Sequence, residues 1–178
     1  MPEHLSPALL CRLLRYDPET GKLFWRARAL SMFSLERAGR TWNTCYAGKE
    51  AFITDDTQGY KVGSIFGRLY KAHRVIWAMQ TGEWPESHID HRDLDPANNR
   101  WHNLREATRS QNLCNTNKRS NNTSGYKGVS WSKRSRKWKA TITHQNKQHR
   151  LGYFSTPEEA HAAYRAAAEK HHGEFRKC

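Results

Sequence analysis

The hydrophobic positions in the first part of the chain group into short elements separated by polar turns. Four leucines between residues 9 and 14 lie on one face of a predicted helix, and Ser6-Pro7 before them is a typical helix start. We expect this helix to end before Asp17-Pro18 and a turn at Thr20-Gly21 to lead into a short strand over residues 22–26. This N-terminal piece is too small to fold alone and should pack on later elements of the chain.

Residues 60–73 predict a β-hairpin, and the residues after it predict a short helix. Apolar and polar positions alternate on either side of Phe66-Gly67, which suits two strands joined by a tight turn. Residues 73–80 carry Val75, Ile76 and Met79 at helical spacing, and Gly82 should end that helix.

Between residues 87 and 115 the pattern is typical of a strand, a loop, a second strand and a helix. Ile89 lies in one short extended run, and residues 101–104 form another. The loop between them is rich in Asp and Asn. Thr108, with Gln111 three residues later, predicts a helix start with a capping box.

Residues 115–123 contain no apolar side chain, which predicts a linker. Three short strands are then expected over 126–131, 137–143 and 147–153, followed by a helix that Thr156 and Glu159 open with a capping box. Alternate residues of the middle strand (Trp138, Ala140 and Ile142) should pack on this helix. The chain is therefore predicted to be an α+β protein with a first module over residues 1–115, a linker over 116–123 and a second module over 124–178.

The charge of the chain favours a polyanionic partner. The formal net charge is +13, and the stretch between Glu106 and Glu158 has eleven Lys or Arg and no acidic residue. Each phosphate that such a stretch neutralises releases a condensed counterion, which drives binding to nucleic acid. A solvated basic surface is the alternative, but an unstructured tail would not need Trp131 and Trp138 among its charges.

The sequence has no N-terminal run typical of a signal peptide and no stretch long enough to span a bilayer. Its cysteines form no paired spacing, which indicates free thiols in a reducing compartment; they are Cys11, Cys45, Cys114 and Cys178. A zinc site is conceivable, but no Cys-x-x-Cys pair supports it. Its ligands would be His88, His91, His102 and Cys114.

Asp90, His91, Asn103 and Asn112 form the candidate for catalysis. Cleavage of a phosphodiester needs a base for water, and His91 suits this task because an imidazole titrates near neutrality. Asp90 and Asn112 offer hard oxygen ligands, which suit Mg²⁺ or Mn²⁺ better than zinc. Neighbouring residues of a strand point to opposite sides, so Asp90 and His91 serve one site only if the backbone twists or bulges. Taken singly, each of these residues is equally consistent with a structural role.

The stretch His88-Ile-Asp-His-Arg-Asp, with Asn98-Asn99-Arg100 and Asn103-Leu104 after it, resembles the HNH endonucleases of the phage and homing type. The resemblance implies a ββα-metal fold, with His91 as general base and with Asp90 and Asn112 as metal ligands. It implies that Asn103 bridges the loop and orients His91, and that Asn98 or Asn99 braces the loop. His73-Arg74 matches the His-Arg that opens the family's pattern, and either a structural hydrogen bond or a phosphate or metal contact would suit His73. Many members have His where this chain has Asn112, although the homing subgroup tolerates Asn.

Residues 124–178 resemble the plant ethylene-response-factor (Apetala-type) DNA-binding domain. Tyr126-Lys-Gly-Val129, Leu151-Gly-Tyr-Phe154 and Thr156-Pro-Glu-Glu-Ala160 occur in that family's order. The resemblance implies a three-stranded antiparallel sheet packed on one helix, with the outer face of the sheet toward DNA. The expected DNA contacts in this module and the linker are Lys118, Arg119, Lys127, Arg134, Lys139, Thr141, Thr143, Gln148 and Arg150. Plant members carry Arg and Trp at several of these places, so their sequence preference does not carry over.

These observations predict a metal-dependent DNA endonuclease with Mg²⁺ or Mn²⁺ as cofactor and double-stranded DNA as partner. One active site per chain suggests nicking by a monomer or weak dimer. A phage or mobile element is the expected source, and the bacterial cytoplasm is the expected location. Two alternatives stay open: a non-catalytic DNA-binding regulator with a decayed nuclease domain, and an RNA-binding factor.

Overall fold

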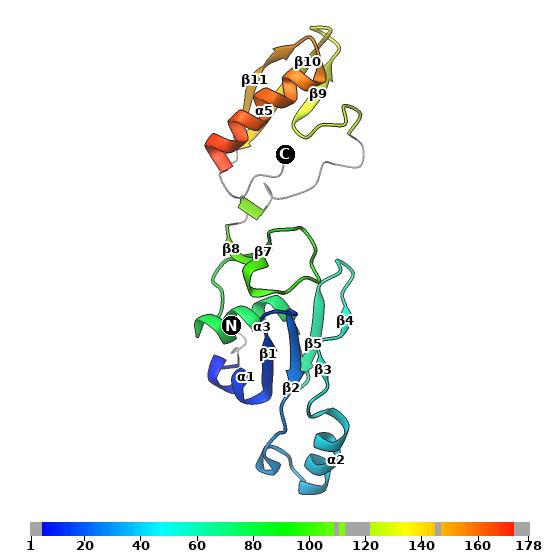
Figure 1. Ribbon diagram of the computed structural model, residues 1–178, viewed down its shortest axis with the longest axis vertical. Coiled ribbons are helices and arrows are strands. Elements are labelled where there is room, and N and C mark those ends of the chain that lie inside the picture. The colour runs from blue at the N-terminus through cyan, green and yellow to red at the C-terminus, as the bar shows by residue number, and fades with distance from the viewer. Residues whose placement is uncertain (1–4, 109–110, 113–121, 145–146, 173–178) are drawn as a thin grey trace. The chain divides into compact units, whose positions relative to one another are not determined.

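The computed structural model describes residues 5–108, 111–112, 122–144 and 147–172 (Figure 1). The chain divides into two compact units, Met1–Glu106 and Ala107–Cys178. The limits predicted at residues 115 and 124 stay predictions. In the described ranges, no helix is both long and apolar enough to cross a membrane.

The first unit begins with helix α1 (Pro7–Leu13), which is shorter than the leucine stripe predicts. Ser6 caps it as expected, because its hydroxyl oxygen accepts a hydrogen bond of 3.3 Å from the backbone N–H of Leu9. Leu14 already has extended backbone and opens strand β1 (Leu14–Asp17). The predicted helix over residues 14–16 is wrong, because these residues pair instead with β2 (Lys22–Trp25). Strand β3 (Glu50–Ala51) completes this sheet.

The hairpin predicted over residues 60–73 is confirmed. Strands β5 (Lys61–Ile65) and β6 (Arg68–Lys71) pair antiparallel, and β4 (Thr54–Asp55) adds a third strand. Phe66 and Gly67 form the two-residue turn with φ angles of 50° and 77°, which is the left-handed backbone that a type I′ turn requires. Helix α3 (Ala72–Thr81) follows directly, and Gly82 ends it as predicted in the left-handed conformation.

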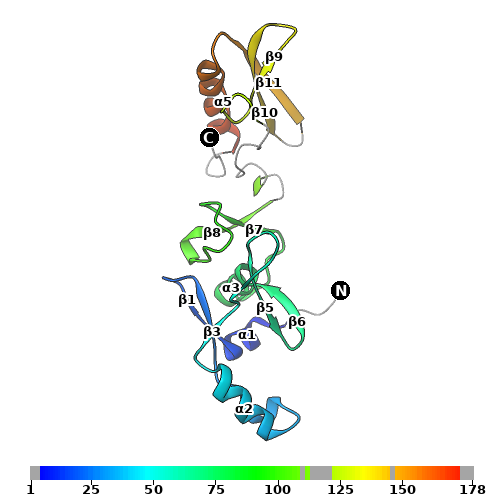
Figure 2. The same ribbon diagram turned by 90° about the vertical axis from the view of Figure 1, so that its right-hand side faces the viewer.

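One apolar core holds these elements together. Its fully buried side chains come from α1, β1, β5 and α3 and include Leu10, Leu13, Leu14, Ile65, Val75 and Ile76. Helix α3 packs against α1 and against the β5–β6 hairpin, which Figures 1 and 2 show from two sides. The N-terminal helix therefore does pack on later elements, as its size predicts.

Residues 27–49, for which the sequence predicts no element, form η1 (Leu30–Met32) and helix α2 (Glu36–Tyr46). Aromatic rings attach this helix: Trp42 packs edge-on against Trp25, with ring centroids 5.6 Å apart. Gly39 brings it close to the preceding turn, since a Cβ there would lie 2.7 Å from the Phe33 ring. In both views α2 lies away from β7 and β8 (Figures 1 and 2).

The strand, loop and strand predicted after residue 87 are present, with one correction. Strands β7 (His88–His91) and β8 (Leu104–Ala107) form a two-stranded sheet. The second strand begins later than predicted, because Trp101–Asn103 form a 3-10 turn (η2). Side-chain hydrogen bonds pull Asn103 into the loop and keep it out of the strand.

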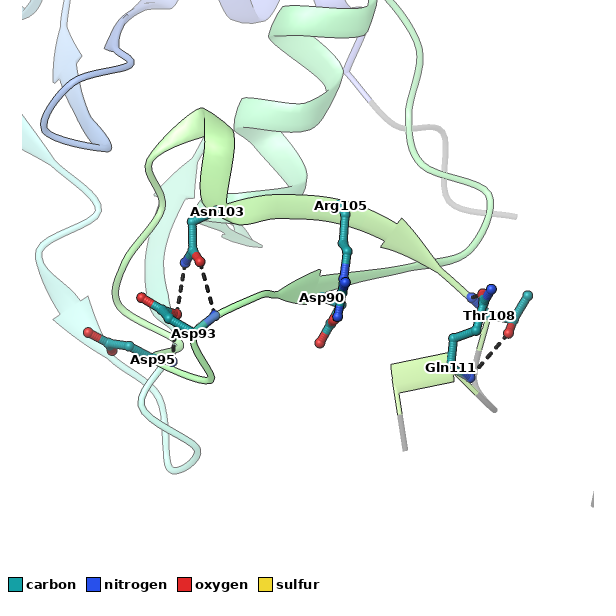
Figure 3. A network of polar contacts seen from close by, with 7 residues as sticks. All are labelled: Asp90, Asp93, Asp95, Asn103, Arg105, Thr108 and Gln111. Carbon is teal, nitrogen blue, oxygen red and sulfur yellow. Dashed lines mark hydrogen bonds and ion pairs between the residues drawn. The ribbon is translucent and has the colours of Figure 1, made fainter. Parts of the chain in front are cut away.

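The capping box predicted at Thr108 is confirmed. The backbone N–H of Gln111 donates to the Thr108 hydroxyl at 3.3 Å, and the Thr108 N–H donates to the Gln111 side chain at 2.8 Å (Figure 3). The described part of this helix is Gln111 and Asn112. Apart from residues 122 and 123, the predicted linker lies outside the described residues.

The second unit is a three-stranded antiparallel sheet packed on one helix, as predicted. Its strands are β9 (Val129–Ser132), β10 (Lys137–His144) and β11 (Lys147–Phe154), with β10 in the centre, and its helix is α5 (Pro157–His172). Ala140 and Ile142 of β10 are buried against Ala160, Tyr164 and Ala168 of α5. Strand β9 starts later than predicted, because Gly128 has left-handed backbone (φ 73°).

Gly128 allows β9, β10 and α5 to approach closely, which leads to a prediction about stability. A Cβ on Gly128 would collide with the Tyr164 ring and would lie 2.8 Å from the Thr141 carbonyl oxygen, on a backbone that disfavours side chains. We expect Gly128→Ala to destabilise the second unit by about 1–3 kcal/mol. Urea unfolding followed by tryptophan fluorescence would measure this loss. Gly125→Ala is the matched control, because Gly125 also has positive φ but no neighbour within 4 Å of the added atom.

Candidate active site and DNA-binding sheet

His91 lies at the end of β7 with 5% of its surface exposed. Its Nε2 atom is 3.1 Å from the side-chain oxygen of Asn99, and since that oxygen only accepts, Nε2 is the donor. A neutral His91 therefore has its lone pair on Nδ1. Burial lowers the pKa of His91, although the Asn99 hydrogen bond and the carboxylates of Asp93 and Asp90 act in the opposite direction. The ring is thus held in the neutral form that can accept a proton at neutral pH.

Asn99, which contacts His91, is itself fixed by the N-terminal hairpin. The Tyr16 hydroxyl of β1 donates a hydrogen bond of 2.8 Å to the backbone oxygen of Asn99. Burial raises the pKa of Tyr16 to about 12, so this hydroxyl keeps its proton. Gly21 lies directly against the same loop, since a Cβ there would be 2.6 Å from the backbone nitrogen of Arg100. Residues distant in sequence therefore position the loop that positions His91.

Two further rings pack on His91. His73 of α3 meets it edge-on with centroids 5.2 Å apart, and Tyr60 lies 5.8 Å away and also contacts His73. Burial is the main cause that lowers the pKa of His73 to about 3, and His91 contributes as well. His73 Nδ1 has no hydrogen-bond partner within the described part of the chain. His73 therefore packs as a neutral ring beside the candidate base.

Asp90 is bound by an arginine that the sequence pattern did not indicate. The Nε and Nη2 atoms of Arg105 on β8 lie 2.8 and 2.7 Å from Oδ2 of Asp90 (Figure 3). The two side chains are 3% and 6% exposed, so this is a buried ion pair. Arg105 gave no signal in the sequence, because one arginine in a strongly basic chain is expected at the surface.

Asn103 braces the Asp- and Asn-rich loop between the two strands. Its amide nitrogen donates to Asp93 Oδ1 at 2.9 Å, and its oxygen accepts from the Asp93 N–H at 3.1 Å (Figure 3). The same nitrogen donates to the Asn98 backbone oxygen at 2.7 Å. Asn98 adds a hydrogen bond to Asp93. Asn103 thus bridges the loop as expected, whereas the side-chain amide that bonds to His91 Nε2 belongs to Asn99.

The proposed metal ligands fit a hard divalent ion by their chemistry. Asp90 offers a carboxylate and Asn112 an amide oxygen, and Mg²⁺ often uses only one or two protein ligands together with water and substrate phosphates. Asn112 is half-buried in the second compact unit, so its role rests on its place in the sequence motif. Over the described ranges, no three His, Cys, Asp or Glu side chains group to hold a metal, and Cys114 of the zinc alternative lies outside the described residues.

Five of the residues expected to contact DNA lie on the β10–β11 pair of the second unit, namely Lys139, Thr141, Thr143, Gln148 and Arg150. Thr141 lies opposite Arg150, and Thr143 lies opposite Gln148. Of the seven expected residues that the structure describes, four are exposed (Arg134, Thr143, Gln148 and Arg150) and three are half-buried (Lys127, Lys139 and Thr141). Tyr153, which the expected set does not include, is 39% exposed and lies opposite Lys139. Lys118 and Arg119 lie outside the described residues.

Comparison with known proteins finds two families in this chain. Residues 70–114 match the HNH endonuclease family, and residues 124–174 match the AP2 domain. The chain is also 37% identical to Protein 3.8 of Escherichia phage T7 over 114 residues, which cover 62% of this chain and 93% of that protein. No solved structure matches the chain. Both resemblances inferred from the sequence are thus confirmed, in the predicted order.

Proposed function

This chain belongs to the HNH endonucleases and carries an AP2 DNA-binding domain, and on that basis we propose that it is a metal-dependent enzyme that nicks double-stranded DNA. A nuclease domain and a DNA-binding domain in one chain indicate a DNA nuclease. The metal, the cut of one strand and the roles of individual residues are the proposal.

The observation that carries the proposal is the state of His91. Asn99 accepts a hydrogen bond from Nε2, and burial keeps the imidazole neutral, so that Nδ1 can take a proton from the attacking water. Tyr60 and His73 limit the movement of the ring by packing on it. Asn103 fixes the loop that carries Asn99 and so acts as a positioning residue.

Asp90 is the residue of the first unit proposed to hold Mg²⁺ or Mn²⁺, and a metal-ligand role for Asn112 stays a prediction from the sequence motif. When bound, the ion supplies positive charge for the phosphate oxygens and for the departing 3′ oxygen. Arg105 holds the Asp90 carboxylate in one orientation within β7–β8. This accounts for a buried carboxylate at the site without requiring that the ion alone compensate its charge.

A plasmid assay tests the proposed reaction. We expect Mg²⁺ or Mn²⁺ to support conversion of supercoiled plasmid to open circles, and a chelator to abolish it, because the ion stabilises charge on the scissile phosphate. Linear DNA formed without open circles would contradict nicking by one site per chain. Cleavage that persists in the chelator would contradict the metal requirement.

A second candidate function is a non-catalytic DNA-binding regulator. The Asp90–Arg105 ion pair favours it, because an arginine already compensates the carboxylate that a metal would use. The same plasmid assay separates the two functions. DNA binding without any metal-dependent cleavage would support the regulator.

The second unit is proposed to anchor the protein on DNA through the outer face of β9–β10–β11. Removing two exposed cations, one in the β9–β10 turn and one on β11, with Arg134→Gln and Arg150→Gln, should reduce the slope of log affinity against log salt by about 2, since each lost phosphate contact removes about 0.9. Anisotropy titrations of labelled duplex at several salt concentrations would measure the slope. Arg165→Gln with Lys170→Gln on α5 removes the same charge and should leave it unchanged; equal slopes for the two pairs would contradict the anchor.

The expected setting is a bacterial cell. Because the chain resembles a protein of an Escherichia phage, we propose that a phage or mobile element encodes it and that it acts on DNA in the host cytoplasm. A monomer or weak dimer suffices for nicking.

A further inference from the structure

A pocket lined by aromatic rings and one arginine lies in the first unit, beside helix α2. It has a volume of about 310 Å³, and its lining residues are Trp25, Arg28, Trp42, Tyr46, Ser64, Phe66 and Gly67. A second cavity of about 780 Å³ shares Trp25 and Arg28 with it and is also lined by Arg12 and Arg26. Of the described residues that line the two cavities, none is acidic. All of them precede residue 70, where the HNH match begins, so both cavities lie outside the two matched domains.

The Arg28 guanidinium lies among the aromatic rings of the pocket and contacts their faces. Its guanidinium carbon is 3.9 Å from the centroid of the Trp42 ring, 5.0 Å from that of Trp25 and 5.2 Å from that of Phe66. Its Nε is buried and has no hydrogen-bond partner among the residues that the structure describes. Burial lowers the pKa of Arg28, which means that the charged form has lost hydration. A bound anion would replace the interactions with water that the Arg28 guanidinium loses on burial.

Phe66 is exposed and strained at the edge of the same pocket. It occupies the first position of the type I′ turn with φ of 50°, where Asn, Asp or Gly is preferred. The residue is nevertheless 51% exposed, so burial in a core does not explain a Phe at this position. Tyr46 at the end of α2 is 49% exposed and lines the same pocket. Strain that neither turn preference nor core packing explains points to a binding role.

We propose that this pocket binds an unpaired base of single-stranded DNA, stacked on the exposed rings, while arginines of the adjoining cavity contact its phosphates. Ring faces and a cationic groove are the two features by which proteins hold single strands. A duplex does not present its base faces, so rings at a pocket edge discriminate against it. This binding goes beyond the proposed cleavage, because it involves residues outside the nuclease motif.

Binding to a fluorescent oligothymidylate of about 15 nucleotides tests this. The full chain is titrated in the presence of chelator, so that a failure of cleavage does not affect the result. We expect Phe66→Asn with Tyr46→Ala to weaken single-strand binding about tenfold, because stacked bases lose their platform. Binding of a duplex of the same length should stay unchanged, since the second unit supplies that contact.

Matched variants separate binding from folding. Phe66→Asn creates the Asn-Gly pair that a type I′ turn prefers, so the hairpin should be at least as stable as before. Leu69→Ala is the control, because Leu69 is 70% exposed on β6 and lines neither cavity. Unchanged single-strand affinity in the double variant, or an equal loss for single strand and duplex, would overturn the proposal.

Photo-crosslinking gives an independent readout with the unmodified protein. An oligothymidylate that carries 5-iodouracil should crosslink to Phe66, Tyr46 or Trp42. Crosslinks confined to the exposed rings of the second unit, Trp131 and Tyr153, would place the single strand on the AP2 sheet and overturn the assignment.

Discussion

Replacement of His91 by alanine should reduce DNA cleavage by about 10²–10⁴-fold while DNA binding is retained, because the variant loses the base that accepts the proton of water. Plasmid nicking rates and duplex affinity would be measured on the same preparation. Asn99→Ala should give a smaller loss, of about 10–100-fold, since the imidazole remains but the hydrogen bond that fixes its proton on Nε2 is removed.

The matched control for this prediction is His88→Ala. His88 lies on the same strand, β7, but is exposed, and the proposed cleavage mechanism gives it no role. It should cleave at the rate of the unmodified protein. Equal losses in the His88 and His91 variants would indicate damage to the β7–β8 sheet and contradict a chemical role for His91.

Breaking the buried ion pair should have the largest effect on stability. Arg105→Ala leaves the Asp90 carboxylate buried at 3% exposure without its guanidinium partner. We expect a loss of about 3–5 kcal/mol in the free energy of unfolding, since removing one partner of a buried ion pair costs about that much. Urea unfolding would measure the loss, with fluorescence reporting on the tryptophans of the first unit.

A double variant separates the stability of the site from its chemistry. Asp90→Leu with Arg105→Met replaces both charges by apolar side chains, which is often neutral or stabilising. It should therefore recover most of the lost stability and bind DNA, but it should not cleave, because the proposed metal ligand is gone. Cleavage by this double variant would show that Asp90 is dispensable. A loss below about 1 kcal/mol for Arg105→Ala would show that the pair matters little to the fold.

The elements that the sequence predicted correctly are those with a strong local signal. The cap at Ser6, the turn at Phe66-Gly67 and the capping boxes at Thr108 and Thr156 depend on residues within four positions of one another. Alternation in β10 identified Ala140 and Ile142 as the face that packs on α5. Helix α2 was not predicted, because the contact that attaches it joins its Trp42 to Trp25, which lies outside the helix.

The order of residues around Asp90 and His91, together with the motif of the second module, determined the family of this chain by itself, because spacing along a strand and loop is a property of the sequence. The tertiary structure decided which side chains meet there. Arg105 rather than solvent faces Asp90, and Asn99 rather than Asn103 bonds to His91 Nε2. Tyr16, which lies 83 positions before Asn99 in the sequence, holds the loop in place through its hydrogen bond to the Asn99 backbone oxygen. Contacts across such separations depend on how the chain packs, and the local pattern does not encode them.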